Sequence, residues 1–450
     1  MDARKNTVLN SSFMQQGFRL LLSYAGSGSS MLAASASQLI TFALLARYLG
    51  SEQFGLYAII TALTNVAVQL CGIGSSEALI RRSAQNPDDY PPLLGHTIIL
   101  SVVSSVVLVI AGLIIMPMTV TIAPDPWVAT RTSLLILISN IVLLKVVSIA
   151  TSAYIAHSRF AVANAIEFGF AILRTITAVV ACLVFSTSTV ADWAFWHFGL
   201  HVVIAVVAMW SLTYLSKPKF VFAREEFMNG VFFSTQFLFK ALRQNADLLV
   251  LNALAGAEIV GSYSVARRIL ESSYLAIEAL NRLVYPGSAK AAKVGMVALL
   301  NRTRQVLLAS LAVSTASALA IFVLAPLLPW LFGDDYPSLI TFTRVLCFVL
   351  IPMAIYASAM EALGAAGRQG TRAAIFNTAN FFGAGLVALM TWQGGINGTF
   401  ASYYIVEIAI AIANWAALVH YARQSVASRD VDAAGAVDAD TGHKAKQENA

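Results

Sequence analysis

GSEQFGLY, residues 50–57, and GAEIVGSY, residues 256–263, share a glycine, a glutamate, a second glycine and a tyrosine at the same four positions. The two octapeptides lie 206 residues apart in a chain of 450 residues, which is close to half its length. Glycine is common in tight connections because it adopts positive φ angles without steric cost. We therefore expect each octapeptide to begin with a turn, and the shared positions indicate two related halves.

Long apolar runs flank both octapeptides and recur along the chain. The composition is 58% hydrophobic and 12% charged, with a mean hydropathy of +0.73, whereas a soluble domain is roughly a quarter charged. A helical run of about 20 apolar residues spans the roughly 30 Å hydrocarbon core of a bilayer. The sequence predicts an all-α polytopic membrane protein with about twelve transmembrane helices. They are expected at residues 24–48, 54–78, 94–118, 128–153, 160–184, 192–215, 228–254, 259–286, 304–328, 338–363, 372–393 and 396–420.

The loop cations predict how the chain is oriented. If the amino terminus is cytoplasmic, nineteen of the 29 lysines and arginines fall at that terminus, in even-numbered connections or in the carboxy-terminal tail. Odd-numbered connections such as 50–53 and 186–192 contain none. Cytoplasmic loops carry an excess of Lys and Arg, so we expect both termini in the cytoplasm.

A second echo supports the repeat. It matches four residues of 159–168 with four residues of 372–381 at a shift of 213. Both sequence matches relate helices that are six apart in the chain. Because six is even, the two halves cross the membrane in the same direction, and an axis along the membrane normal relates them. Coincidence between short turns is the alternative. We expect two pseudo-symmetric six-helix bundles, 24–215 and 228–420, around a central cavity. The remaining parts are a cytoplasmic or interfacial segment 1–23, a cytoplasmic linker 216–227 and a disordered cytoplasmic tail 421–450.

Ten cations lie within the expected spans or at their ends. They are Arg47, Arg131, Lys145, Arg174, Lys240, Arg243, Arg267, Arg268, Arg282 and Arg344. Seven carboxylates share the same segments, namely Glu77, Glu167, Asp247, Glu271, Glu278, Glu361 and Glu407. A cation facing lipid at the bilayer centre costs about 2.5–3.5 kcal/mol. These side chains therefore face protein, water or one another, and the surplus of cations favours an anionic ligand.

Some of these charges form stripes at helical spacing. Lys240, Arg243 and Asp247 share one face of the seventh helix. The eighth helix carries Arg267, Glu271, Glu278 and Arg282, and the fifth carries Asn164, Glu167 and Arg174. The alternative to a binding surface is a set of structural ion pairs, such as Arg267 with Glu271 and Glu278 with Arg282.

Other residue patterns give no reason to expect an enzyme, a metal or a cofactor. Cys71, Cys182 and Cys347 are isolated in apolar segments, and His197 with His201 lacks a third metal ligand. The acidic pairs at 88–89 and 334–335 are expected in short solvated turns. No loop has a basic stripe with interleaved aromatic residues, so nucleic acid is not expected as a partner.

Four stretches resemble a known family. ARYLGSEQFGLY at 46–57 is similar to the first helix and turn of bacterial polysaccharide-transport flippases, in the multidrug, oligosaccharidyl-lipid and polysaccharide exporter superfamily. The stretches 245–268, 331–336 and 394–398 resemble that family's seventh helix, a Leu-Phe-Gly-x-x-Tyr connection and its last glycine turn. The turn residues that carry the resemblance are Gly50, Gly55, Tyr57, Gly256, Gly261 and Tyr263.

The resemblance implies a flippase of the bacterial inner membrane. It would move undecaprenyl-diphosphate-linked oligosaccharide repeat units from the cytoplasmic to the periplasmic leaflet by alternating access, for exopolysaccharide, capsule or O-antigen synthesis. Glycan polymerase and chain-length proteins would be its partners beside the lipid bilayer. The alternatives are a cation-coupled multidrug exporter of the same superfamily and a membrane-embedded glycan polymerase or ligase.

A diphosphate headgroup gives the intramembrane charges a role, because Arg and Lys can replace part of the water that phosphate loses on entry. The cations expected to contact it are Lys145, Arg174, Lys240, Arg243 and Arg267. The carboxylates expected to pair with these cations or to couple transport to ions are Glu167, Asp247, Glu271 and Glu278.

Overall fold

Helices build the part of the chain that the structure describes. The computed structural model describes residues 36–336 and 338–447, and it contains no strand within them. Eight helical stretches of these residues are long and apolar enough to cross a membrane. Two of them, Arg224–Asn281 and Gln369–Val426, have 58 residues each, enough for two crossings. The prediction of an all-α polytopic membrane protein is confirmed.

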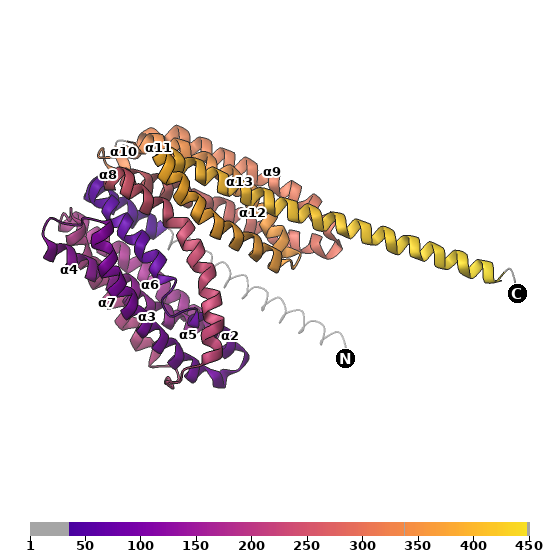
Figure 1. The fold of residues 1–450 in the computed structure, drawn as a ribbon, viewed down its shortest axis with the longest axis horizontal. Helices are drawn as coiled ribbons and strands as arrows, with labels where there is room; N and C mark the ends of the chain where they lie inside the picture. Colours follow the sequence, from indigo (N-terminus) through magenta and orange to yellow (C-terminus); the bar gives the residue numbers. More distant parts are fainter. Residues whose placement is uncertain (1–35, 337, 448–450) are drawn as a thin grey trace, which may run out of the picture. The chain divides into compact units, whose positions relative to one another are not determined.

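Figure 1 shows the helices in chain order. A helix at residues 36–68 is followed by α2 (Ser75–Gln85), η1 (Pro87–Asp89), α3 (Tyr90–Thr119), α4 (Pro126–Leu137), η2 (Ile138–Leu143), α5 (Leu144–Ala156), α6 (Phe160–Val179), η3 (Val180–Val184) and α7 (Val190–Leu212). Then come α8 (Arg224–Val294), α9 (Met296–Leu324), η4 (Ala325–Leu327), α10 (Leu328–Phe332), α11 (Leu339–Leu346), η5 (Cys347–Val349), α12 (Leu350–Ala365) and α13 (Gln369–Gln447).

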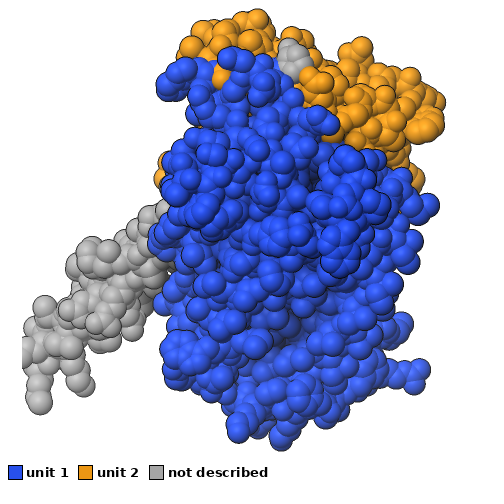
Figure 2. All heavy atoms as spheres, turned by 90° about the vertical axis from the view of Figure 1, so that its left-hand side faces the viewer, with its two compact units in different colours: residues 1–241, 330–336 blue, residues 242–329, 337–450 orange. Residues whose placement is uncertain are grey.

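The chain divides into two compact units, coloured separately in Figure 2. Unit 1 is Met1–Ala241 with Trp330–Tyr336, and unit 2 is Leu242–Pro329 with Pro337–Ala450. The boundary falls within α8. The expected segment 1–23 lies outside the described residues. α13 continues to Gln447, where the sequence predicts a disordered tail, and the many alanines there favour a helix.

Three glycines with positive φ interrupt long helices. Gly50 has φ 72° within the helix at 36–68, Gly256 has φ 80° within α8, and Gly395 has φ 56° within α13. An L-residue rarely adopts such a backbone conformation, so glycine permits the chain to leave one helical axis and start another. Each kink lies where the sequence places a connection between two spans.

Unit 1 has a core in which α5, α6 and α7 pack together. Val147, Ile166 and Ile204 are buried in one cluster, and the Tyr154 hydroxyl in that cluster donates to the Ser211 carbonyl at 2.7 Å. The apolar face of α3 points outward instead. More than half of the surface of each of Val103, Val107 and Ile110 on this helix is exposed. A helix that exposes such a surface is suited to contact with lipid tails.

Unit 2 has a core formed by α9, α12 and α13. Leu299 of α9 contacts a cluster that includes Ala359 and Leu363 of α12 and Leu418 of α13. The indole Nε1 of Trp415 donates to the Ile355 carbonyl at 2.8 Å. Small side chains at 359 and 362 allow α12 to pack closely against its neighbours, which is the usual packing mode of membrane helices.

The second expected span is broken in the middle. The sequence predicts a continuous helix over 54–78, and this is wrong: the helix ends at residue 68, the chain turns through 69–74, and α2 begins at Ser75. Gly72, Ile73 and Gly74 all have positive φ, of 75°, 45° and 66°. A β-branched residue with positive φ is strained, so the surrounding structure must hold the turn in place.

Backbone packing against α8 holds this turn. A Cβ atom on Gly230 would lie 2.1 Å from the Ile73 carbonyl oxygen, and one on Gly74 would lie 2.6 Å from the Gly230 carbonyl oxygen. The amide of Gly72 donates to Ser104 Oγ at 2.8 Å. Only glycine at 74 and 230 permits this approach. We refer to residues 69–74 as the helix break.

Candidate functional site

Lys145 of α5 lies against the helix break. A Cβ atom on Gly72 would be 2.9 Å from Lys145 Nζ, and Nζ donates to Ser76 Oγ at 3.1 Å, in the first turn of α2. No carboxylate lies within 4 Å of Nζ in the described part of the chain. Ser101 Oγ, which a Cβ on Gly72 would meet at 2.8 Å, is also buried at this place and has no hydrogen-bond partner among the described residues. The site therefore offers one cation and the hydroxyl group of Ser101 to a ligand.

The kink of α8 builds a buried charge network in unit 2. Asp247 lies before Gly256, and Tyr263 and Arg267 lie after it. The Asp247 carboxylate accepts from the Tyr263 hydroxyl at 2.6 Å and from Arg267 Nη1 at 3.1 Å to each oxygen. Asp247 is 1% exposed. Buried charges are stable when they are paired and fully hydrogen-bonded, as Asp247 is.

Glu271 extends this network by one helical turn. Its carboxylate accepts from Arg267 Nε at 2.9 Å and from Arg268 Nη1 at 3.5 Å. The ion pair between Arg267 and Glu271, one of the alternatives that the sequence leaves open, is thus present in the structure. We refer to Asp247, Tyr263, Arg267, Arg268 and Glu271 as the α8 network.

Arg243 has a different partner from the one that helical spacing suggests. Its Nη1 donates to Glu407 Oε1 of α13 at 2.9 Å, and its Nε donates to Asn380 Oδ1 at 2.8 Å. Gly383 makes room for the side chain, because a Cβ there would lie 3.0 Å from Arg243 Cδ. The sequence analysis includes Glu407 among the carboxylates of the expected spans without giving it a partner, and it does not find Asn380. No spacing rule relates residues 137 and 164 positions away.

The other predicted site residues have different surroundings. Lys240 is exposed on α8 and has no ion-pair partner among the described residues, and the same holds for the exposed Glu167 of α6. The Arg174 guanidinium lies 5.6 Å from the centre of the Phe170 ring. Glu278 is half-buried, and the side chain of its predicted partner Arg282 lies outside the described residues.

Two more of the ten cations bind backbone carbonyls. Arg47 Nη1 donates to the carbonyls of Trp330 and Leu331 in α10, and Arg344 Nε donates to the Phe322 carbonyl at 3.3 Å. In the loop after α10, the Tyr336 hydroxyl donates to the Ala46 carbonyl at 2.6 Å. Burial raises the pKa of this phenol, which keeps the donor proton in place.

The two histidines of α7 belong to a hydrogen-bonded cluster. His197 Nε2 lies 2.9 Å from Asn140 Oδ1, and Asn140 Nδ2 donates to Thr64 Oγ1 at 3.0 Å. His201 Nδ1 lies 2.7 Å from the His197 carbonyl oxygen. Asn140 belongs to η2, a π-helical turn of the kind often found at functional sites. The described residues contain no group of three or more His, Cys, Asp or Glu that could hold a metal ion.

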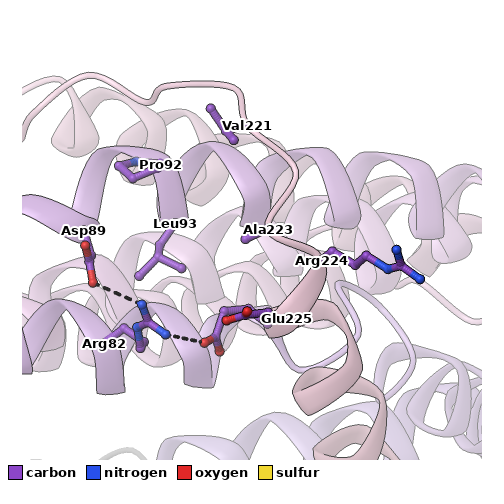
Figure 3. A pocket seen from close by; sticks show the side chains of 9 residues that line it. Arg82, Asp89, Pro92, Leu93, Val221, Ala223, Arg224 and Glu225 are labelled. Atoms are coloured by element: carbon purple, nitrogen blue, oxygen red, sulfur yellow. Dashed lines mark hydrogen bonds and ion pairs between the residues drawn. The ribbon is translucent and has the colours of Figure 1, made fainter.

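A second ion-pair cluster joins α2 and α8 at the end predicted to be cytoplasmic. Glu226, with 5% of its side chain exposed, accepts from Arg81 Nη2 at 3.1 Å and from Arg82 Nη1 at 2.9 Å. Asp89 pairs with Arg82 at 3.5 Å. A pocket of about 310 Å³ lies beside this cluster and is lined by Arg82, Asp89 and Glu226 among others. Figure 3 shows the side chains of Arg82 and Asp89 pointing toward each other at this pocket.

Comparisons with known proteins relate the sequence of this chain to a family and its structure to a known fold. Residues 23–291 match a family model described as polysaccharide biosynthesis protein. A comparison with curated proteins finds no significant match to the chain.

Solved structures of transporters share the fold. An inward-facing multidrug resistance MATE family transporter of the MOP superfamily has a TM-score of 0.69 and 14% identity, over 88% of this chain and 95% of that one. An outward-facing transporter of the same description has a TM-score of 0.57 and 15% identity, over 89% and 93%. A MOP superfamily transporter from Pyrococcus furiosus, described as having a binding pocket of reverse polarity, has a TM-score of 0.58 and 15% identity, over 87% and 93%.

Proposed function

Because this chain belongs to the polysaccharide biosynthesis protein family, we propose that it is a flippase for an undecaprenyl-diphosphate-linked oligosaccharide. It moves the repeat unit from the cytoplasmic to the periplasmic leaflet of the bacterial inner membrane by alternating access, and both termini lie in the cytoplasm. The shared fold of MATE family transporters supports a transporter over a glycan polymerase or ligase.

Lys145 carries this proposal. It is a cation in a membrane-spanning stretch, and no carboxylate of the described residues lies within 4 Å of it. An unpaired charge in a medium of low dielectric is unstable, so the site gains stability when an anion enters. A diphosphate supplies the negative charge and several acceptor oxygens, which match the ammonium group and the hydroxyl of Ser101.

The other four predicted headgroup contacts divide into two groups. Lys240 and Arg174 remain proposed contacts for the diphosphate or the sugars. Arg243 and Arg267 are each paired with a carboxylate in the structure, so an anion must compete with Glu407 for the first and with Asp247 and Glu271 for the second. We therefore rank Lys145 first as a headgroup contact.

A cation-coupled multidrug exporter is the second candidate, because the matching solved structures are described as multidrug transporters. Such a protein would use carboxylates to attract cationic drugs. Here three of the intramembrane carboxylates, Asp247, Glu271 and Glu407, are already paired with arginines, so a cationic drug would have to compete with those arginines for them.

A leaflet assay tests the proposal. Inner-membrane vesicles with and without the protein are loaded with radiolabelled undecaprenyl-diphosphate oligosaccharide, and the label in each leaflet is measured. We expect the wild-type chain to move the lipid to the periplasmic leaflet and Lys145→Ala to leave it on the cytoplasmic side. Lys217→Ala, an exposed lysine before α8, is the matched control and should behave as wild type. Unchanged leaflet distribution with altered dye export would instead identify a multidrug exporter.

A further inference from the structure

Glu407 has a carboxylate that is only half paired. Oε1 accepts from Arg243, whereas Oε2 is buried and receives no hydrogen bond from any residue that the structure describes. Only 4% of the side chain is exposed. An ionised carboxylate accepts hydrogen bonds at both oxygens, and a buried oxygen without a donor loses the solvation it had in water. A proton on Oε2 would remove that charge.

A proton on Glu407 would change the ion pair of this carboxylate with Arg243. Its ion-pair partner is Arg243 of α8, and Tyr274 on α8, Tyr356 on α12 and Tyr403 on α13 are close enough to interact electrostatically with the carboxylate. Arg267 and Glu271 also act electrostatically on Tyr403, and both are paired within the α8 network, Arg267 with Asp247 and Glu271, and Glu271 with Arg267 and Arg268. Arg243 is thus the one charged group of the described residues that is paired directly with Glu407.

We propose that Glu407 takes up a proton at Oε2 when Arg243 binds a phosphate group, so that the anion and the proton bind together. This inference rests on the proposed function, since it concerns the same headgroup. The proton comes from a buffer acid or hydronium ion and forms an O–H bond at Oε2, while no covalent bond of the protein breaks. The pair then changes from neutral to a net charge of +1.

The sign of the coupling follows from electrostatics. With Glu407 ionised, its negative charge repels a second anion from Arg243. With Glu407 protonated, that repulsion disappears, and the guanidinium keeps Asn380 as an anchor and directs its other N–H groups to a phosphate. By linkage, anion binding must raise the affinity of Glu407 for a proton by the same factor as the proton raises the affinity for the anion.

Calorimetry on the purified full-length protein tests the inference. The probe is P1,P2-dimethyl diphosphate, a diester that does not itself titrate between about pH 5.5 and 8. Titrations in two buffers of different ionisation enthalpy give the number of protons taken up per bound anion. For the wild type we expect binding that tightens as pH falls, by up to about tenfold per pH unit, with uptake of up to about one proton.

Variants separate the two partners. Glu407→Gln keeps the shape and is neutral, so it should bind tightly at every pH without proton uptake through this pair. Arg243→Gln should lose this pH-linked binding. Glu258→Gln changes an exposed carboxylate in the Gly256 turn and should behave as wild type.

Three outcomes would overturn the inference: wild-type binding without proton uptake, Glu407→Gln that keeps the wild-type pH dependence, or no binding to either protein at any pH. The wild-type measurement decides the matter even if Glu407→Gln fails to fold. Binding that needs Lys145 but ignores pH would refute the coupling and leave the flippase proposal standing.

Discussion

The α8 network and the helix break give a cation inside the membrane opposite surroundings: carboxylate partners in the network, and none within ion-pair distance among the described residues at the break. In the network, Arg267 is paired with the carboxylates of Asp247 and Glu271, and every charge has a counter-charge. At the break, Lys145 has a hydroxyl partner and no carboxylate within 4 Å among the described residues. The difference indicates that the first arrangement stabilises the fold, whereas the second keeps a charge available for a ligand.

The largest expected effect comes from removing the acid of the network. Asp247→Ala leaves Arg267 buried with only Glu271 as its counter-charge, and losing one partner of a buried pair costs about 3–5 kcal/mol in the free energy of unfolding. Chemical denaturation of the detergent-solubilised protein measures it. Glu258→Ala, which removes an exposed carboxylate of the same unit, is the control. A wild-type denaturation curve for Asp247→Ala would mean that the network does not stabilise unit 2.

Lys145→Gln should have the opposite effect to Asp247→Ala: it should slow transport and leave the stability of the protein nearly unchanged. A hydrogen bond to a charged group is worth about 1.5–3 kcal/mol, so we expect flipping to slow by about 10- to 100-fold while the free energy of unfolding changes by less than about 1 kcal/mol. The leaflet assay and denaturation on the same preparation provide both numbers. If the variant loses stability and keeps its transport rate, Lys145 is a structural residue and the comparison fails.

Gly230→Ala tests whether close backbone packing against α8, rather than an ion pair, stabilises the helix break. The added Cβ would lie 2.1 Å from the Ile73 carbonyl oxygen, and relieving such a clash in a packed interior costs about 1–3 kcal/mol. Gly169→Ala in α6 meets no atom within 4 Å and should be neutral or slightly stabilising, because alanine favours helix. Equal stabilities of the two variants, measured by thermal unfolding, would show that the backbone contact is unimportant.

The smallest effect is expected at the ion-pair cluster around Glu226, which joins α2 and α8 in unit 1. Glu226→Gln removes a buried carboxylate whose partners Arg81 and Arg82 are 58% and 42% exposed, so solvent weakens the pairs and the loss should be about 1 kcal/mol. The difference from wild type should shrink at high salt, as expected for exposed arginines. A loss as large as that of Asp247→Ala would place a second stabilising network in unit 1.

How much the sequence could predict depends on the range of the interactions. Apolar run lengths and glycine turns depend on local residues, which is why the all-α membrane fold and the positions of Gly50, Gly256 and Gly395 could be read directly. The pairing of Arg243 with Glu407 joins residues 164 positions apart, and no periodicity encodes it.

The helix break shows a different reason for failure. Its signal, Gly72-Ile73-Gly74, lies inside an apolar run, and hydropathy alone favours an uninterrupted helix there. The break depends on Gly230 of α8, whose close approach is invisible in a single stretch of sequence. Two glycines separated by one residue in a predicted span are the cue that could have located it.

The kink at Gly256 also bears on how the chain enters the membrane during synthesis. Asp247 and Arg267 are only 20 residues apart and meet across one helical hairpin, so their ion pair forms without help from any other helix. A hairpin that leaves the translocon with its acid and base already joined presents a neutral pair to the lipid. Separate insertion of the two arms would expose each charge to a penalty of about 2.5–3.5 kcal/mol. The same contact that stabilises the mature protein thus lets a charged helical hairpin partition into the bilayer as a unit.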